Sequence, residues 1–320
     1  MGGKMIHCFA DSGIVFKRLP LGLLRRTSAG LITVLVIIFG WVSAPLCITF
    51  KDALEREVTL KGEPHRIVTL APSITEILYF LGLGNRVVGV TQFSYYPLEA
   101  KLKPKVGSYI DLNVEKIISL APDLVIGTAD GNQPGVVDLL EQAGIPVFIV
   151  NPRNIRQAID TIATVGLLCG IPQKANELSA QLSQRVDHIL DQTKSKRKPL
   201  VFLQINLRPI MTINKDTFLH DLIQLAGGRN MAKNEPIFYP RISLEEVIRK
   251  KPEVIIISSM ERGGRFEAAR VEWLKWSSIP AVKDGRVHLI DSDLIDRPSP
   301  RIIEGLEAMA RFIHPEVKWE

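Results

Sequence analysis

The chain is poor in cysteine and histidine. Its 320 residues include three cysteines and six histidines. Cys8 and Cys47 lie in or beside an N-terminal apolar run, so the rest of the chain holds only Cys169. A disulfide framework is therefore excluded, and stability must come from hydrophobic cores. No two histidines form a short-spaced pair, so a bare metal ion would need ligands that converge from distant segments.

The sequence also lacks the short motifs of common enzyme classes. It contains no G-x-S-x-G elbow, no phosphate-binding loop and no H-E-x-x-H zinc motif. Gly82 and Gly84 form a G-x-G, but they follow a predicted helix and precede a predicted strand, the wrong order for a dinucleotide turn. No enzyme is expected. An enzyme or a bare-metal carrier on a similar two-lobed fold remains the alternative of another class.

The N-terminus has the order of an export signal. Several basic residues between positions 17 and 26 precede an uncharged apolar run at residues 29–47. That run is also long enough to span a bilayer as an uncleaved anchor, and the large Leu46 before Cys47 argues against a lipoprotein site. Residues 1–50 are thus predicted to be an export signal or an N-terminal membrane anchor. We expect a periplasmic protein, free or tethered to the inner membrane.

Little excess charge remains after this segment. Residues 1–50 carry five Lys or Arg and one acid, and so supply four of the six net positive charges of the chain. The remaining two are too few to indicate nucleic acid as a partner.

From residue 66 onward, short β-rich runs alternate with amphipathic stretches. Runs such as "RIVTL" and "DLVIG" and stretches such as "SITEILYFLGLG" are typical of βα units with a mostly parallel sheet. Residues 66–150 and 199–314 each predict one α/β lobe. The connecting residues 151–198 include an amphipathic stretch from about 172 to 194, which predicts a stiff helix long enough to span both lobes. The predicted fold is two Rossmann-like α/β lobes with central, mostly parallel sheets, joined by one long rigid helix.

One phrase occurs twice. "VEKIISLAPDLVIG" at residues 114–127 and "LEEVIRKKPEVIII" at residues 244–257 lie 130 positions apart, and each has a glutamate second and a Pro-acidic pair ninth and tenth. The repeat indicates that the second lobe duplicates the first.

Several segments follow one another in a characteristic order, among them "RIVTLAPSITEILYFLG", "VGSYIDLNVEKIISLAPDLVIG", "YPRISLEEVIRKKPEVIII" and "DRPSPRIIEGLEAMARF". Their order resembles that of the helical-backbone (class III) periplasmic substrate-binding proteins of ABC importers. The resemblance covers roughly residues 64–314 and is closest to the cobalamin-binding branch. It implies a carrier without a resident cofactor, which captures a corrinoid of the cobalamin (vitamin B12) type between its lobes and delivers it to a permease.

The resemblance also gives the repeat a role. In that family each lobe presents a glutamate that docks onto arginines of the permease, and the doubled phrase matches this motif at Glu115 and Glu245. The implied partner of this expected monomer is an ABC permease dimer with its ATPase subunits. First-turn glutamates also interact favourably with a helix dipole, so two solvated surface glutamates are the alternative.

The ligand is expected at the loops that follow the strands of both lobes. Flat aromatics suit a planar or macrocyclic ligand, and a few polar groups orient it. The candidate ligand-binding residues are Tyr95, Tyr96, Tyr109 and Asn132 in the first lobe and Asn206, Phe238, Tyr239, Arg241, Asp293 and Arg297 in the second. For Asp293 and Arg297 the resemblance adds a reason: in the family an aspartate and an arginine four residues later approach the ligand before the last helix.

The chain departs from the cobalamin branch in its tryptophans. Members of that branch commonly use tryptophan in the ligand cage, whereas all four tryptophans here lie outside the expected cleft loops. Tyr109 and Tyr239 stand where tryptophan is expected. A ferric siderophore or haem therefore remains an alternative ligand.

Overall fold

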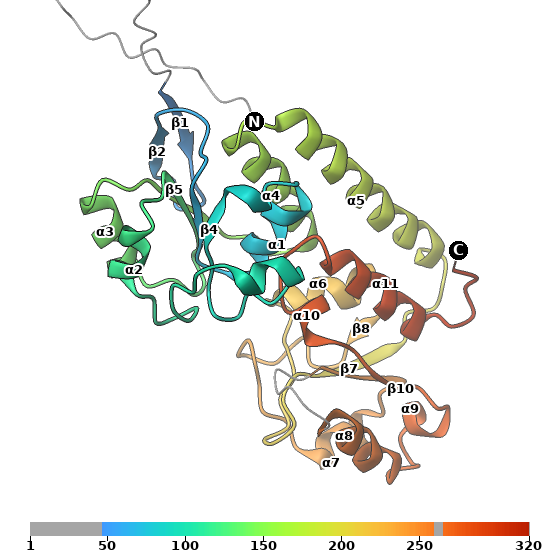
Figure 1. Ribbon diagram of the computed structural model, residues 1–320. Coiled ribbons are helices and arrows are strands. Elements are labelled where there is room, and N and C mark those ends of the chain that lie inside the picture. The colour runs from blue at the N-terminus through green and yellow to red at the C-terminus, as the bar shows by residue number, and fades with distance from the viewer. Residues whose placement is uncertain (1–46, 259–264, 320) are drawn as a thin grey trace, which may run out of the picture.

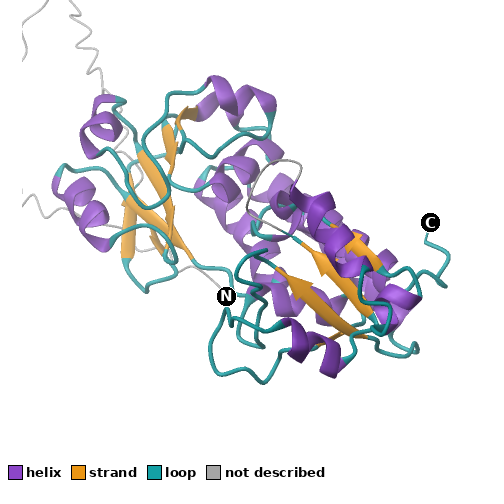
Figure 2. Ribbon diagram, turned by 90° about the horizontal axis from the view of Figure 1, so that it is seen from below, coloured by secondary structure: helices purple, strands orange, loops and turns teal. Residues whose placement is uncertain are grey.

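The computed structural model describes residues 47–258 and 265–319. Two α/β lobes lie next to each other, and the long helix α5 (Pro172–Thr193) runs along both (Figure 1). Each lobe has a four-stranded parallel sheet with helices on both faces (Figure 2). The predicted fold class is confirmed.

The first lobe is built on a sheet with the strand order β4-β3-β5-β6. Its strands are β3 (Ile67–Thr69), β4 (Val87–Gly89), β5 (Leu124–Thr128) and β6 (Val147–Val150). Its helices are α1 (Pro72–Phe80), α2 (Val114–Ser119) and α3 (Pro134–Gln142), with the 3-10 turns η1 (Gly84–Arg86) and η2 (Leu98–Leu102). Strands β5 and β6 are buried along their whole length, as expected for parallel strands covered on both faces.

The second lobe repeats this topology with the order β8-β7-β9-β10. Its strands are β7 (Leu200–Gln204), β8 (Arg229–Asn230), β9 (Val254–Ile257) and β10 (Val287–Leu289). Its helices are α6 (Phe218–Leu225), α7 (Leu244–Lys250), α8 (Arg265–Leu274), α9 (Pro280–Lys283), α10 (Ser292–Ile295) and α11 (Ile302–Ile313). In both lobes the first strand pairs in parallel with the third, so the duplication extends to sheet pairing.

The helix that joins the lobes was predicted at about 172–194 and is observed at Pro172–Thr193. Pro172 opens it at a position where a missing N–H costs nothing. Its buried stripe, which includes Leu182 and Val186, belongs to a core that continues from α1 and α4 (Ile155–Leu168) to α6 and α11. Because one core runs from lobe to lobe, we expect only a modest tilt between them.

A hairpin precedes the first lobe and was not anticipated. Strands β1 (Ile48–Lys51) and β2 (Glu57–Leu60) pair antiparallel. Buried Asp52 accepts backbone hydrogen bonds inside the turn, and the Arg56 guanidinium donates to the carbonyl of Val147 at 3.1 Å. The hairpin is thereby fixed to the edge strand β6.

The predicted export signal or anchor lies almost entirely outside the described residues, in segment 1–46. Within residues 47–258 and 265–319, no helix combines the length and apolar character that crossing a membrane requires.

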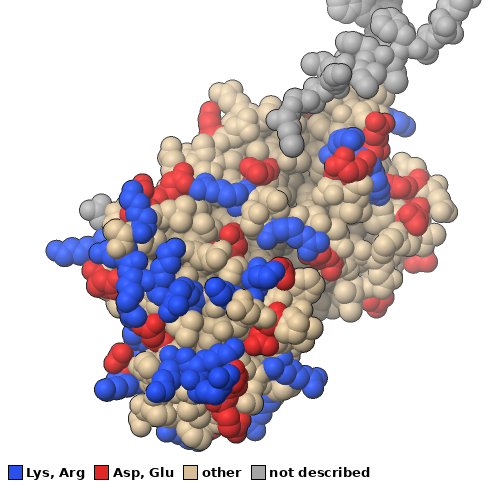
Figure 3. Space-filling view, turned by 180° about the vertical axis from the view of Figure 1, so that it is seen from behind, with Lys and Arg blue, Asp and Glu red and all other residues tan. Residues whose placement is uncertain are grey.

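One face of the molecule has a concentration of basic side chains. Lys and Arg side chains gather over the second lobe, in the lower part of Figure 3, with Asp and Glu among them. This positive charge lies on the outside of the lobe, because no Lys or Arg is among the described residues that line the cleft between the lobes.

Candidate functional site

A cleft of about 590 Å³ lies between the two lobes. Its walls come from the segments after β3, β4, β5 and β6 in the first lobe and after β7, β8 and β10 in the second, mostly at the carboxyl ends of parallel strands. The lining residues include Ser73, Tyr109, Thr128, Asp130, Asn151, Asn206, Met211, Phe218, Tyr239 and Asp296. Three of the ten predicted ligand residues are therefore on the cleft: Tyr109, Asn206 and Tyr239.

Tyr109 is held firmly in the first wall. Its hydroxyl is hydrogen-bonded to Thr128 Oγ1 at 2.8 Å, and burial raises the pKa of this tyrosine. Its ring lies against the backbone of Gly131, where an added Cβ would be only 1.7 Å from Tyr109 Cε1. Only glycine leaves room for the ring in this position.

Asn132 fixes this arrangement from behind. It is buried, its Oδ1 accepts from the N–H of Thr128 at 2.7 Å, and its Nδ2 donates to the carbonyls of Leu70 and Tyr109 at 3.1 Å each. The side chain is fully used in joining three loops and is not among the residues that line the cleft. It positions Tyr109.

Tyr239 stands in the opposite wall on a more exposed loop. Tyr239 is 52% exposed, and its neighbours Ile237 and Phe238 are each 58% exposed. Burial raises the pKa of Tyr239, and nearby Asp130 and Asp296 add to the shift. Phe238 contributes its carbonyl to the loop, by accepting from the N–H of Asn214 at 3.0 Å, and its ring is not in the cleft lining.

The other polar candidates in the second lobe lie near the cleft with different roles. Asn206 lines it and donates from Nδ2 to the carbonyl of Pro209 at 2.8 Å. Arg241 is exposed and is not among the lining residues, but its backbone bridges to that of Met211, which does line the cleft.

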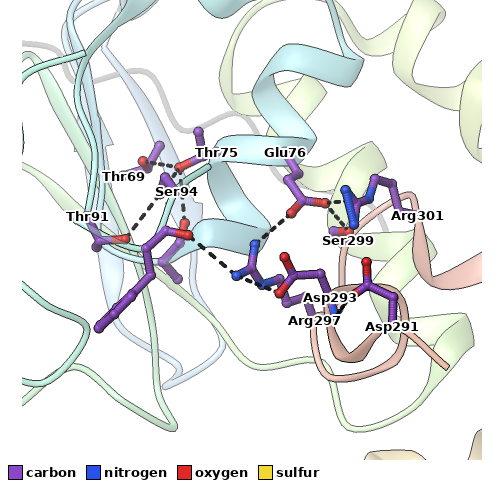
Figure 4. A network of polar contacts seen from close by, with 12 residues as sticks. Thr69, Thr75, Glu76, Thr91, Ser94, Asp291, Asp293, Arg297, Ser299 and Arg301 are labelled. Atoms are coloured by element: carbon purple, nitrogen blue, oxygen red, sulfur yellow. Dashed lines mark hydrogen bonds and ion pairs between the residues drawn. The ribbon is translucent and has the colours of Figure 1, made fainter. Parts of the chain in front are cut away.

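Arg297 and Asp293 belong to an ion network that joins the lobes (Figure 4). Arg297 contacts Asp293 at 2.9 Å and Glu76 of the first lobe at 3.1 Å. Ser299 donates to the other oxygen of Glu76 at 2.7 Å, with Arg301 at 3.6 Å. Neither Arg297 nor Asp293 is among the residues that line the cleft.

Glu76 is the centre of this network. Its side chain is almost completely buried in α1, and burial raises its pKa against the opposing effects of Ser299, Arg301 and Arg297. A buried carboxylate in this position ties the first lobe to the segment between α10 and α11.

The first-lobe residues Tyr95 and Tyr96 lie beside this network and not in the cleft. The ring of Tyr95 packs edge to face against Phe93, with 6.4 Å between centroids. The guanidinium of Arg301 lies 4.1 Å from the ring centroid of Tyr96, and both line a separate cavity of about 790 Å³. Tyr96 thereby contacts the second lobe, where Arg301 lies just before α11.

Sequence reasoning missed several residues of the cleft, and one of them, Asn151, could have been inferred. Asn151 directly follows the predicted strand "PVFIV", so the rule for carboxyl ends of parallel strands would have placed it there. Asp296 adjoins the nominated Arg297. It had no signal of its own, because only the turn after α10 directs it into the cleft.

The predicted docking glutamates occupy matching positions. Glu115 on α2 and Glu245 on α7 are exposed, each in the first turn of its helix, and neither makes an ion pair within the described part of the chain. Hydrogen bonds from its own backbone N–H and from Ser243 lower the pKa of Glu245.

The local backbone of the two repeated phrases is also alike. The N-caps Asn113 and Ser243 each accept from a backbone N–H three residues on. Both helices are followed by a residue with positive φ, Ala121 at 44° and Lys251 at 52°, directly before a proline. The same backbone therefore presents both glutamates.

The acid after that proline explains the rest of the phrase. Asp123 accepts from the backbone N–H groups of His65 and Arg66 just before β3, and Glu253 accepts from that of Leu200 at the start of β7. Each acid ties the third strand of its lobe to the first.

Comparison with known proteins identifies the family of the chain. A family described as periplasmic binding protein matches residues 67–294. An uncharacterized ABC transporter substrate-binding lipoprotein of Bacillus subtilis, YvrC, is 35% identical over 276 residues, which cover 84% of this chain and 86% of that protein. A vitamin B12-binding protein of Yersinia pestis is 30% identical over 238 residues, covering 74% of this chain and 82% of that protein.

Solved structures give the same picture. The periplasmic vitamin B12 binding protein BtuF of Vibrio cholerae has a TM-score of 0.70 and 28% identity, and the match covers 79% of this chain and 97% of that one. The periplasmic heme-binding protein RhuT of Roseiflexus sp. RS-1 has a TM-score of 0.70 and 28% identity, with 80% and 100% covered.

Proposed function

The chain belongs to the periplasmic binding protein family, and on this basis we propose that it captures a corrinoid between its lobes and delivers it to an ABC permease. Its relatives are substrate-binding transport proteins, so no catalytic step is part of the proposal. We further propose that it acts as a periplasmic monomer, with residues 1–50 as its signal or anchor.

One observation carries the choice of ligand: two tyrosines, Tyr109 and Tyr239, face the same cleft from opposite lobes. The cleft is otherwise largely apolar, with Met211 and Phe218 among its lining residues. Two flat rings on opposite walls suit the faces of a large macrocycle, and the size of the cleft is within the usual range for small-molecule sites.

Haem is the second candidate. It is also a planar macrocycle, and a heme-binding protein is as similar in structure to this chain as the vitamin B12 carrier is. The phenol of a tyrosine is a known axial ligand of haem iron, so the two tyrosines fit this ligand as well.

Delivery to a permease is the role we propose for Glu115 and Glu245. Their equivalent positions on α2 and α7 give each lobe one exposed carboxylate on the same local backbone. A two-lobed carrier with such paired handles fits a two-fold symmetric permease dimer and its ATPase subunits. Docking would then bias the carrier toward release, to the extent that the permease prefers the open form.

Calorimetric titration of the purified protein with cyanocobalamin, cobinamide, a ferric siderophore and haem tests the proposal. We expect saturable one-to-one binding of the corrinoids that weakens in Tyr109→Ala and in Tyr239→Ala. Binding of haem or the siderophore alone would keep the carrier function and change the ligand. Absence of binding to all four would refute the proposed function.

A further inference from the structure

Asp296 is a carboxylate on the cleft without a partner of its own. It follows α10, where its backbone N–H donates to Ser292 O at 2.8 Å, and Pro298 lies two residues later. Its side chain makes no hydrogen bond or ion pair with the residues that the structure describes. The turn after α10 therefore leaves the Asp296 carboxylate available to accept hydrogen bonds from a molecule in the cleft.

The other charges around the cleft are already paired. Asp130 on the first wall contacts Arg153 at 3.0 Å, and Asp293 contacts Arg297 at 2.9 Å. No Lys or Arg is among the described lining residues. Among the charged residues that the structure describes in the cleft lining, Asp296 is therefore the one without an ion-pair partner.

The surroundings make this charge sensitive to its partner. Asp296 is exposed on the cleft, yet the walls withdraw enough water to raise its pKa to about 7, with Asp293 and Asp291 adding to the shift and Arg297 opposing it. The ionised form of a carboxyl group in such a place is stabilised by an N–H donor and destabilised by a second carboxylate.

We propose that Asp296 selects the ligand of this cleft by charge: it accepts hydrogen bonds from amide or cationic groups at the edge of a macrocycle and repels carboxylates there. The inference rests on the proposed function, since it concerns the same cleft. Corrinoids carry carboxamides around their ring, whereas haem carries two propionate carboxylates. One unpaired aspartate would thus separate the two ligand classes found among the relatives of this chain.

Cyanocobalamin and its monocarboxylic acids, in which one ring amide is hydrolysed to a carboxylate, form a matched pair for the test. At pH 8 and low salt we expect the wild-type protein to bind the acids about tenfold more weakly than cyanocobalamin. Asp296→Asn keeps the shape of the side chain and removes the charge. It should weaken cyanocobalamin binding about threefold, strengthen binding of the acids, and reduce the gap to about twofold or less.

Asp138→Asn on α3 is the matched control, because Asp138 is exposed and lies outside the cleft. It should leave both affinities unchanged. Thermal unfolding of each variant shows whether it is folded. An unchanged gap in folded Asp296→Asn, or equal wild-type affinity for both corrinoids, would overturn the inference and leave the corrinoid function standing. Wild-type preference for haem over cyanocobalamin would overturn both together.

Discussion

The two lobes share one topology but build different walls for the cleft. In the first lobe Tyr109 is bonded to Thr128, its carbonyl is held by Asn132, and its ring rests on Gly131. In the second lobe Tyr239 stands on a loop whose apolar neighbours are more than half exposed. The first wall is therefore preformed, whereas the second can adjust to the ligand.

The exposed glutamates Glu115 and Glu245, in contrast, stand on closely similar backbone in the two lobes. The helices that carry Glu115 and Glu245 both have a side-chain N-cap, and both are followed by a residue with positive φ. In both lobes an acid after the helix ties the third strand to the first. The duplication has thus preserved the surface that we propose meets the permease, whereas the two surfaces that we propose meet the ligand have diverged.

Reversing the charge of both Glu115 and Glu245 tests the proposed docking surface and should have the largest effect of the changes considered. We expect Glu115→Arg with Glu245→Arg to reduce ligand uptake more than about 100-fold in cells that contain the cognate permease, because two attractive contacts become repulsive. Ligand affinity of the purified variant should not change, since neither residue lines the cleft.

The matched control places the same charges elsewhere. Glu57→Arg with Glu177→Arg alters two exposed glutamates on β2 and α5 and should leave uptake at the wild-type level. Normal uptake by the Glu115/Glu245 double variant would exclude docking through these residues.

The preformed wall should collapse when Asn132 is removed. Asn132→Ala leaves buried groups of Thr128, Leu70 and Tyr109 without their partner, so we expect a loss of about 2–3 kcal/mol in the free energy of unfolding. Urea denaturation measures this. Asn206→Ala, which removes one exposed hydrogen bond from the second wall, should cost less than about 1 kcal/mol. Equal losses would mean that the first wall is no more rigid than the second.

Removing the charge of Glu76, which links the two lobes, should have a smaller effect on stability. Glu76→Gln removes the charge that Arg297 and Arg301 share, and we expect a loss of about 1–2 kcal/mol in the free energy of unfolding, with a larger spread of lobe orientations in X-ray scattering. Glu99→Gln, on the exposed turn η2, is the control and should change neither quantity. Unaltered scattering and stability in Glu76→Gln would show that the shared core alone sets the angle between the lobes.

Local signals in the sequence predicted the scaffold well. The helix α5 was anticipated because Pro172 and a regular apolar spacing mark it within one stretch of chain, and the repeat predicted the second lobe from the first. The hairpin β1–β2 was missed because its anchor, the Arg56 contact to Val147, joins residues 91 positions apart.

The candidate site was less predictable because its residues are recruited over long separations. Tyr109 and Tyr239 lie on the cleft, since loops at strand ends converge there. Arg297 instead pairs with Glu76, 221 positions away, and no pattern in the sequence announces such a pair.

The smallest expected effect is a pH dependence of the preference between cyanocobalamin and its monocarboxylic acids. It tests whether Asp296, in the second wall, selects the ligand by charge. The folded-state pKa of Asp296, about 7, lies above its ordinary value, so the carboxyl is charged at pH 8 and protonated at pH 5.5. Arg297, Asp293 and Asp291 are its charged neighbours, and the phenol of Tyr239 lies near enough to interact with it electrostatically.

The preference for cyanocobalamin over its monocarboxylic acids should therefore fall from about tenfold at pH 8 to about threefold or less at pH 5.5. The acids themselves remain largely ionised over this range, because an ordinary carboxyl titrates near pH 4. In Asp296→Asn the ratio of the two affinities should not change with pH. A parallel change in that variant would assign the titration to a group other than Asp296, and the second wall would then have no part in selecting the ligand by charge.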